Sequence, residues 1–215
     1  MHKIDRETVA IPACLIEPPE RYRDLRKADL EAIRSALLTM QGQRCAYCER
    51  RTGDERNDGH IEHFRNQAKH GELECDWTNL FWSCMDEKTC GKYKDKCTKE
   101  SGPQKKFNRE DIINPAQEDP EDFFLFVYDG TVRIADGLSE TNKHRAEETL
   151  RVFQLDRSPF LRKSREDAVE PYINMIKTIF AISPDHVLPY VQSELGKLDT
   201  KPFSTPIKNF LKSVS

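Results

Sequence analysis

The chain has 215 residues, of which 37% are hydrophobic and 33% are charged, and its formal net charge is −3. This length allows one hydrophobic core or a small catalytic module wrapped by helices, and the apolar content argues against global disorder. No stretch reaches the roughly 20 apolar residues of a membrane span, and no apolar secretory segment opens the sequence, so we expect a cytoplasmic protein without a membrane partner.

The residues before the first cysteine pair predict one lead-in helix. Apolar residues recur at helical spacing from Glu20 to Met40, and Gly42 ends the pattern. Residues 43–98 follow with most of the cysteines and little periodicity. Such a segment needs a stabilising element other than an apolar core, which points to a bound metal.

The second half of the chain predicts a small hairpin followed by helices. The aromatic stretch 123–128, then Asp129-Gly130, then the β-branched stretch 131–134 are typical of two strands joined by a tight turn. Helical patterns then run from an N-cap at Ser139 to Leu155, from Pro159 to Ile182, from Pro184 to Leu195 and from Pro206 to Val214. We therefore divide the chain into an N-terminal segment with its helix (1–42), a cysteine-rich core (43–110) and a hairpin with C-terminal helices (111–215).

Two cysteine pairs predict a structural zinc site. Cys45 and Cys48 form a C-x2-C knuckle, and Cys84 and Cys90 are separated by five residues. In a reducing compartment such pairs are tested first as metal ligands, and two short loops can converge on one tetrahedral Zn²⁺. Four thiolates leave no open coordination position, so the chemistry must lie elsewhere. The alternatives for the fourth ligand are Cys97 and Cys75.

An acid–histidine pair lies between the two cysteine pairs. Hydrolysis of a phosphodiester needs an activated water and a cation that neutralises charge on the phosphate. His63 can activate the water, because a neutral imidazole titrates near physiological pH. Glu62 precedes it on a predicted strand and therefore projects to the opposite face, so the two side chains cannot share one task.

These residues and their spacing resemble the zinc-knuckle form of the HNH endonuclease pattern. The resemblance rests on Glu62-His63, on Asn79-Leu80 five residues before a cysteine, and on Lys94 four residues after Cys90. The stretch from Asp119 to Leu150 is similar to the PtuB family, which supplies the nuclease subunit of Septu anti-phage systems and of a retron defence system that borrows the Septu pair. The resemblance covers about residues 1–165.

The resemblance implies an α+β fold in which a ββα-metal (HNH) zinc-knuckle core is wrapped by N-terminal and C-terminal helices, with one small hairpin. It implies a nuclease that hydrolyses DNA or RNA, in which Glu62 binds one catalytic Mg²⁺ or Mn²⁺ and Asn79 braces the loop that orients His63. The partners it implies are a PtuA-type ATPase and, in a retron setting, a reverse transcriptase with its msDNA. The alternative is a zinc-stabilised module that binds nucleic acid or protein without catalysis.

The sequence departs from the HNH pattern at Gly91, where the family usually has Asn or His. Glycine has no side chain to bind a metal, so another residue must supply the remaining ligand. Asp95 is one candidate, because it lies one helical turn after Gly91 if residues 91–97 form a helix. His60 is the other candidate, because it lies two residues before Glu62 on the same strand face.

The run from Lys88 to Lys106 is strongly basic, with seven lysines and two acids. Alone, such a run is as typical of a solvated loop as of a binding surface. Its place beside the cysteine cluster favours contact with phosphate groups. The residues expected to make those contacts are Arg65, Lys92 and Lys94.

Overall fold

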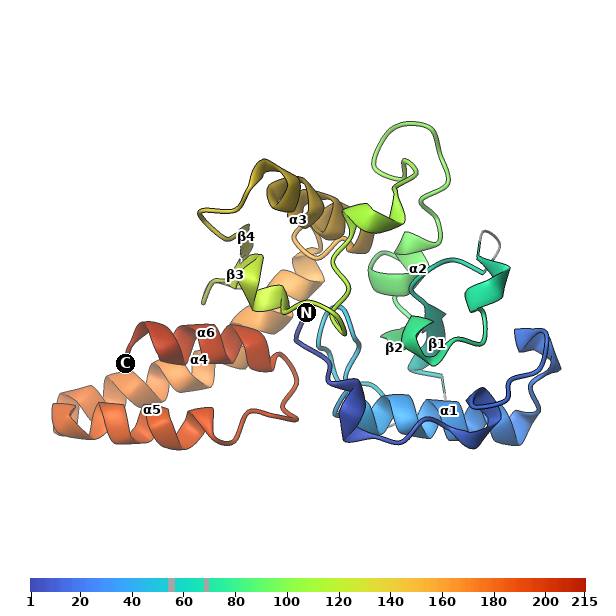
Figure 1. Ribbon diagram of the computed structural model, residues 1–215. Coiled ribbons are helices and arrows are strands. Elements are labelled where there is room, and N and C mark those ends of the chain that lie inside the picture. Colours follow the sequence, from blue (N-terminus) through green and yellow to red (C-terminus); the bar gives the residue numbers. More distant parts are fainter. Residues whose placement is uncertain (54–56, 68–69) are drawn as a thin grey trace.

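The computed structural model describes residues 1–53, 57–67 and 70–215, and these residues form helices and two small antiparallel sheets (Figure 1). The α-helices and strands are, in chain order, α1 (Lys27–Met40), β1 (Gly59–His63), β2 (Leu80–Cys84), α2 (Cys90–Lys94), β3 (Phe124–Phe126), β4 (Val132–Ile134), α3 (Glu140–Phe153), α4 (Pro159–Ile182), α5 (Val187–Leu195) and α6 (Ser204–Ser213). Single 3-10 turns lie at Arg6–Thr8, Ala13–Leu15, Tyr22–Asp24, Gly71–Leu73, Trp77–Asn79, Arg109–Asp111, Pro120–Asp122 and Pro184–His186. The predicted α+β fold class is confirmed.

The lead-in helix α1 exists but begins later than its apolar pattern. A 3-10 turn at Tyr22–Asp24 precedes it, and the helix starts where the Asp29 carboxylate accepts a hydrogen bond from the backbone N–H of Arg26 at 3.0 Å. That bond satisfies one of the N–H groups that a helix start leaves without a partner. The buried face of α1 then packs against β2.

Strands β1 and β2 form the sheet that carries the candidate site. They pair antiparallel, with Gly59 opposite Cys84 and His63 opposite Leu80. All of β2 is buried, because α1 and α2 both contact this strand. Because the strands are antiparallel, the end of β1 lies beside the start of β2, and α2 begins six residues after β2 ends and packs against that strand.

The predicted hairpin and the helix after it are confirmed. Strands β3 and β4 pair antiparallel, and the Asp129 carboxylate accepts a hydrogen bond from the backbone N–H of Thr131 at 3.0 Å in the turn. Gly130 has φ +78°, and a Cβ there would lie 2.0 Å from the carbonyl oxygen of Arg162 on α4. Ser139 caps α3 by accepting a hydrogen bond from the N–H of Asn142.

Helices α4, α5 and α6 form a separate small core at one end of the molecule, away from β1 and β2 (Figure 1). The α4 boundaries match the prediction, while the residues after Pro184 make one 3-10 turn before α5 begins. α6 starts two residues before Pro206, because proline is tolerated in the first turn of a helix. Among the described helices, none combines the length and the apolar content that crossing a bilayer requires.

Buried charges join these C-terminal helices to the cysteine-rich core. The Arg44 guanidinium donates hydrogen bonds to the carbonyl oxygens of Asp199 at 2.7 Å and Lys201 at 3.1 Å. The Glu49 carboxylate, 1% exposed, accepts from the Met1 ammonium at 2.8 Å and from the N–H of Thr205 at 2.9 Å. Each buried charge thus has a polar partner, as burial requires.

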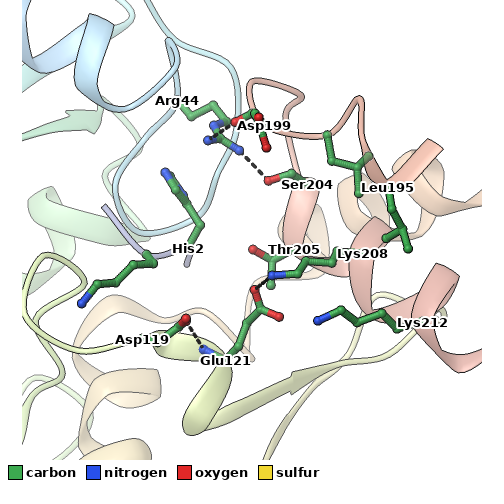
Figure 2. Close-up of a pocket in the computed structure, with 12 residues that line it drawn as sticks. His2, Arg44, Asp119, Glu121, Leu195, Asp199, Ser204, Thr205, Lys208 and Lys212 are labelled. Carbon is green, nitrogen blue, oxygen red and sulfur yellow. Dashed lines mark hydrogen bonds and ion pairs between the residues drawn. The ribbon is translucent and has the colours of Figure 1, made fainter. Parts of the chain in front are cut away.

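A cavity of about 360 Å³ lies at this junction, between the N-terminal residues and α6 (Figure 2). Lys208 and Lys212 of α6 line one side, and Lys208 pairs with Glu121 at 2.5 Å across it. No residue that the sequence predicts for catalysis or metal binding lines the cavity. The chemistry must therefore be sought at the β1–β2 sheet.

Candidate functional site

The four cysteines expected to bind zinc come together. Among the described residues, Cys45, Cys48, Cys84 and Cys90 each offer a sulfur, and these atoms all lie within 4.8 Å of one another in a buried cluster. The Sγ atoms of Cys48 and Cys84 are 3.9 Å apart. A tetrahedral zinc with Zn–S bonds of about 2.3 Å requires S–S separations of about 3.8 Å. The donor set and its spacing therefore fit a structural Zn²⁺.

Local backbone geometry aims these sulfurs at one point. The Cys45–Cys48 turn closes when the N–H of Glu49 bonds the Cys45 carbonyl at 3.1 Å, and the N–H of Ala46 bonds the Trp82 carbonyl on β2. Cys90 opens α2 with φ +55°, a left-handed conformation that costs a non-glycine residue about 1–2 kcal/mol. Burial raises the pKa of the Cys90 thiol well above its usual value, so a cation is needed to hold it as a thiolate.

The two alternative zinc ligands lie outside the cluster. Cys97 is buried after α2, where its thiol contacts the Tyr93 carbonyl at 3.7 Å. Cys75 is buried between two 3-10 turns and belongs to the main apolar core. Neither sulfur joins the four that converge, so both are excluded as ligands of this site in the described structure.

His63 ends β1, and its imidazole is held by Gln67 and Glu74. Its Nε2 lies 2.9 Å from the Glu74 carbonyl oxygen, and the side-chain amide of Gln67 is 3.1 Å from the same nitrogen. A proton on Nε2 would be donated to the Glu74 carbonyl and would leave Nδ1 as the basic nitrogen. The Tyr22 ring packs edge-on against the imidazole at 4.7 Å, and burial lowers the pKa of His63 below its usual value.

Asn79 fixes the loop that starts at His63. Its side-chain oxygen accepts from the N–H of Arg65 at 2.7 Å, and its side-chain nitrogen donates to the carbonyl oxygens of Arg65 at 3.1 Å and Leu73 at 3.0 Å. Leu73 directly precedes Glu74, whose carbonyl holds His63. The buried amide therefore ties together the two segments that orient the imidazole.

Glu62 lies on the opposite strand face and is almost completely buried, with 2% exposure. Its Oε2 is 3.0 Å from Nε2 of His60, and its Oε1 is 2.5 Å from the Lys94 ammonium. Burial alone would raise the pKa of Glu62, but Lys94 and His60 outweigh burial and lower it. Glu62 is therefore an ionised carboxylate inside a cluster of charged and polar side chains.

The glycine at position 91 is explained by its distance from Glu62. A Cβ on Gly91 would lie 2.3 Å from Oε2 of Glu62, well inside van der Waals contact. The backbone of α2 thus approaches the carboxylate directly, in the position where a side chain would stand. The close packing of Glu62 against α2 therefore explains why a glycine stands where the HNH pattern has Asn or His.

Replacing Gly91 with alanine should therefore destabilise the protein. Overpacking of this kind costs about 1–3 kcal/mol, and Glu62 must move or α2 must shift to relieve it. Urea unfolding measures the effect. Gly196→Ala is the matched control, because a Cβ there meets its nearest atom at 3.7 Å. Equal stability of the two variants would contradict the close packing at Gly91.

The candidate ligands of a catalytic divalent ion do not fit one in this arrangement. Lys94, on α2, is 2% exposed, and its ammonium contacts Glu62 at 2.5 Å and Asp95 Oδ1 at 3.4 Å. His60 contacts the other oxygen of Glu62. An ammonium cannot ligate a metal, and it repels a second cation placed beside the same carboxylate. The expected phosphate contact at Lys94 is likewise replaced by internal contacts.

The other expected phosphate contacts lie nearer the surface. Arg65 is partly exposed and lines a cavity of about 230 Å³ together with Lys94, Asp95 and Arg109, and it also lines a second cavity of about 180 Å³. Lys92 is partly exposed on α2.

Sequence reasoning missed three residues near these groups: Tyr22, Gln67 and Arg109. Of the three, only Gln67 could have been found from the sequence, because it lies four residues after His63. Tyr22 and Arg109 are distant in sequence from the residues they approach.

Comparison with known proteins identifies two relatives, and no protein-family model matches the chain. The chain is 31% identical over 97 residues to "Septu protein PtuB" of Bacillus thuringiensis, a match that covers 45% of this chain and 34% of that protein. It is 26% identical over 150 residues to "Retron Vc95 putative HNH endonuclease" of Vibrio cholerae serotype O1 biovar El Tor, covering 67% of each. The chain thus matches about a third of the PtuB protein's length, and the predicted resemblance to PtuB and HNH proteins is confirmed.

Proposed function

We propose that the chain is an HNH-type nuclease that hydrolyses phosphodiester bonds in DNA or RNA. The observation that carries the proposal is His63, whose imidazole is fixed by the Glu74 carbonyl and by the loop that Asn79 braces, on the strand that pairs with β2, where one cysteine of the cluster that fits zinc is found. The similarity to a retron protein named as an HNH endonuclease supports this chemistry. A module that only binds would not need an oriented, neutral histidine.

His63 is suited to the role of general base. With the proton on Nε2 held by the Glu74 carbonyl, Nδ1 can accept a proton from the attacking water. Arg65 and Arg109 line the neighbouring cavity and offer positive charge to the phosphate backbone. Mg²⁺ or Mn²⁺ would supply further charge neutralisation, but in this structure the Lys94 ammonium lies beside Glu62 in place of such an ion.

The direction of the His63 pKa predicts the pH profile of cleavage. A general base works when it is unprotonated, so activity is present above its pKa and lost as the pH falls through it. Because burial lowers the pKa of His63, the acid limb of the rate profile should lie below pH 6.5. Single-turnover rates measured across this range test the prediction. An acid limb above pH 6.5 would contradict it.

We also propose that the nuclease works in anti-phage defence, with a PtuA-type ATPase and, in a retron setting, with a reverse transcriptase and its msDNA. The names of the two relatives support this assignment. The helices α4–α6 offer a surface for such a partner, because they stand apart from the site (Figure 1). Separate elution of the co-expressed proteins in gel filtration counts against the complex.

A cleavage assay with purified, zinc-loaded protein tests the nuclease proposal. The substrates are duplex DNA, single-stranded DNA and tRNA, each with Mg²⁺, with Mn²⁺ and with EDTA. His63→Ala protein, purified in parallel, controls for contaminating nucleases. Cleavage by the wild type alone supports the proposal, while a folded wild type that binds nucleic acid but cuts none of the substrates favours the non-catalytic zinc module.

A further inference from the structure

We propose that the Lys94 ammonium is the built-in cation of the candidate site and fills the position beside Glu62 that a divalent metal would otherwise occupy. The inference rests on the proposed function for its catalytic meaning, because HNH chemistry is what makes a cation at Glu62 relevant. Its geometric basis is independent of that function. That basis is the set of oxygen atoms around the buried Lys94 Nζ atom, which we call the cage.

Four oxygen atoms from two segments surround the Lys94 Nζ atom. Glu62 Oε1 lies at 2.5 Å and Asp95 Oδ1 at 3.4 Å, so two carboxylates face it. The main-chain carbonyl oxygens of His63 and Phe64 also accept hydrogen bonds from it, the latter at 3.3 Å. Carboxylates and backbone carbonyls are the donors that hard cations such as Mg²⁺ and Mn²⁺ prefer.

The Lys94 ammonium occupies the position between these oxygen atoms. The Lys94 side chain is 1% exposed, so its ammonium is held inside the protein. His60 lies at the other oxygen of Glu62, and the Gly91 backbone lies so close to that oxygen that a Cβ there would be 2.3 Å from it. A divalent ion can therefore reach Glu62 only after the Lys94 side chain leaves.

The same ammonium also positions the general base. It binds the carbonyl of His63 itself, and thus fixes the end of β1 on which the imidazole is carried. Loss of Lys94 from the cage would free the Glu62 and Asp95 carboxylates and release the His63 backbone together. Lys94 is therefore a positioning residue whose departure would couple metal entry to movement at His63.

Titration with Mn²⁺ tests the proposal on full-length, zinc-loaded protein. Lys94→Met should create one Mn²⁺ site that binds at least about tenfold more tightly than any site of the wild type, because removing the ammonium leaves two carboxylates facing the vacated position. The control Lys92→Met removes the same charge from the same helix, two residues away, and should gain nothing. Calorimetry or the electron paramagnetic resonance signal of free Mn²⁺ measures the binding.

A second pair of variants ties the new site to the cage. Adding Glu62→Gln to Lys94→Met should abolish the gained Mn²⁺ site, and Lys94→Arg, which keeps a cation, should not gain one. Folding is checked by circular dichroism and zinc content. If Lys94→Met does not fold without Mn²⁺ but folds when Mn²⁺ is added, the ion has replaced the ammonium as proposed.

Two results would overturn the inference. One is a folded Lys94→Met protein that binds Mn²⁺ no more tightly than the wild type. The other, which needs no Lys94 variant, is a wild-type Mn²⁺ site of micromolar affinity that Glu62→Gln abolishes. Neither readout involves cleavage, so a protein that gains Mn²⁺ as expected but cuts no nucleic acid contradicts the nuclease proposal alone.

Discussion

Replacing Cys84 with serine is expected to remove zinc from the protein and to unfold the segment that carries His63 and Glu62. A serine hydroxyl stays protonated where a thiolate is needed, so the tetrahedral site loses one of its four ligands. Structural zinc contributes apparent free energies of about 10–16 kcal/mol, comparable with the whole stability of a domain. Elemental analysis and near-ultraviolet circular dichroism measure the two effects.

Cys97→Ser is the matched control for that experiment. Cys97 is as buried as the cluster cysteines, at 5% exposure, but its sulfur lies outside the cluster. This variant should keep one zinc per chain. Its stability should fall only slightly, because the serine hydroxyl is a polar group in an apolar setting. A Cys84→Ser protein with full zinc content and wild-type melting would exclude the four-thiolate site.

The His63→Ala variant is expected to lose about 10²–10⁴-fold in the rate of nucleic-acid cleavage, the range that general base catalysis contributes. The fold should persist, because the imidazole makes polar contacts only to the Glu74 carbonyl and the Gln67 amide among the contacts described. Single-turnover kinetics with excess enzyme separate this chemical effect from substrate binding.

The control for His63 is His144→Ala on α3. The His144 side chain is 55% exposed and faces Asp111 at 3.7 Å, far in sequence from the site. The cleavage rate of the His144→Ala variant should equal that of the wild type. Full activity in a pure, folded His63→Ala protein would disprove the role of His63 as the base.

Features fixed by local sequence could be predicted. The spacing of Cys45 and Cys48, and of Cys84 and Cys90, identified the cluster because each tight loop by itself presents two sulfurs on one side. The hairpin turn and the α4 boundaries follow from residues a few positions apart. The start of α1 was wrong by seven residues, because the apolar pattern continues through the 3-10 turn at Tyr22–Asp24.

Features that depend on distant pairs could not be predicted. A lysine in a basic run is normally exposed, yet Lys94 is buried against Glu62. The pairing could not be foreseen, because Glu62 lies 32 positions earlier in the chain. The same reason hides the role of Gly91, whose missing side chain makes sense only against Glu62. Sequence spacing therefore located the site, while the charge arrangement inside it needed the fold.

The Arg44 guanidinium connects the C-terminal helices to the cysteine cluster. It donates hydrogen bonds to the carbonyl oxygens of Asp199 and Lys201 in the segment that leads into α6. The residue after Arg44 in the chain is the cluster cysteine Cys45. The residue next to a cluster cysteine thus ties the C-terminal helices to the cysteine-rich core, and removal of the segment before α6 would take away two hydrogen-bond acceptors of the buried Arg44 guanidinium.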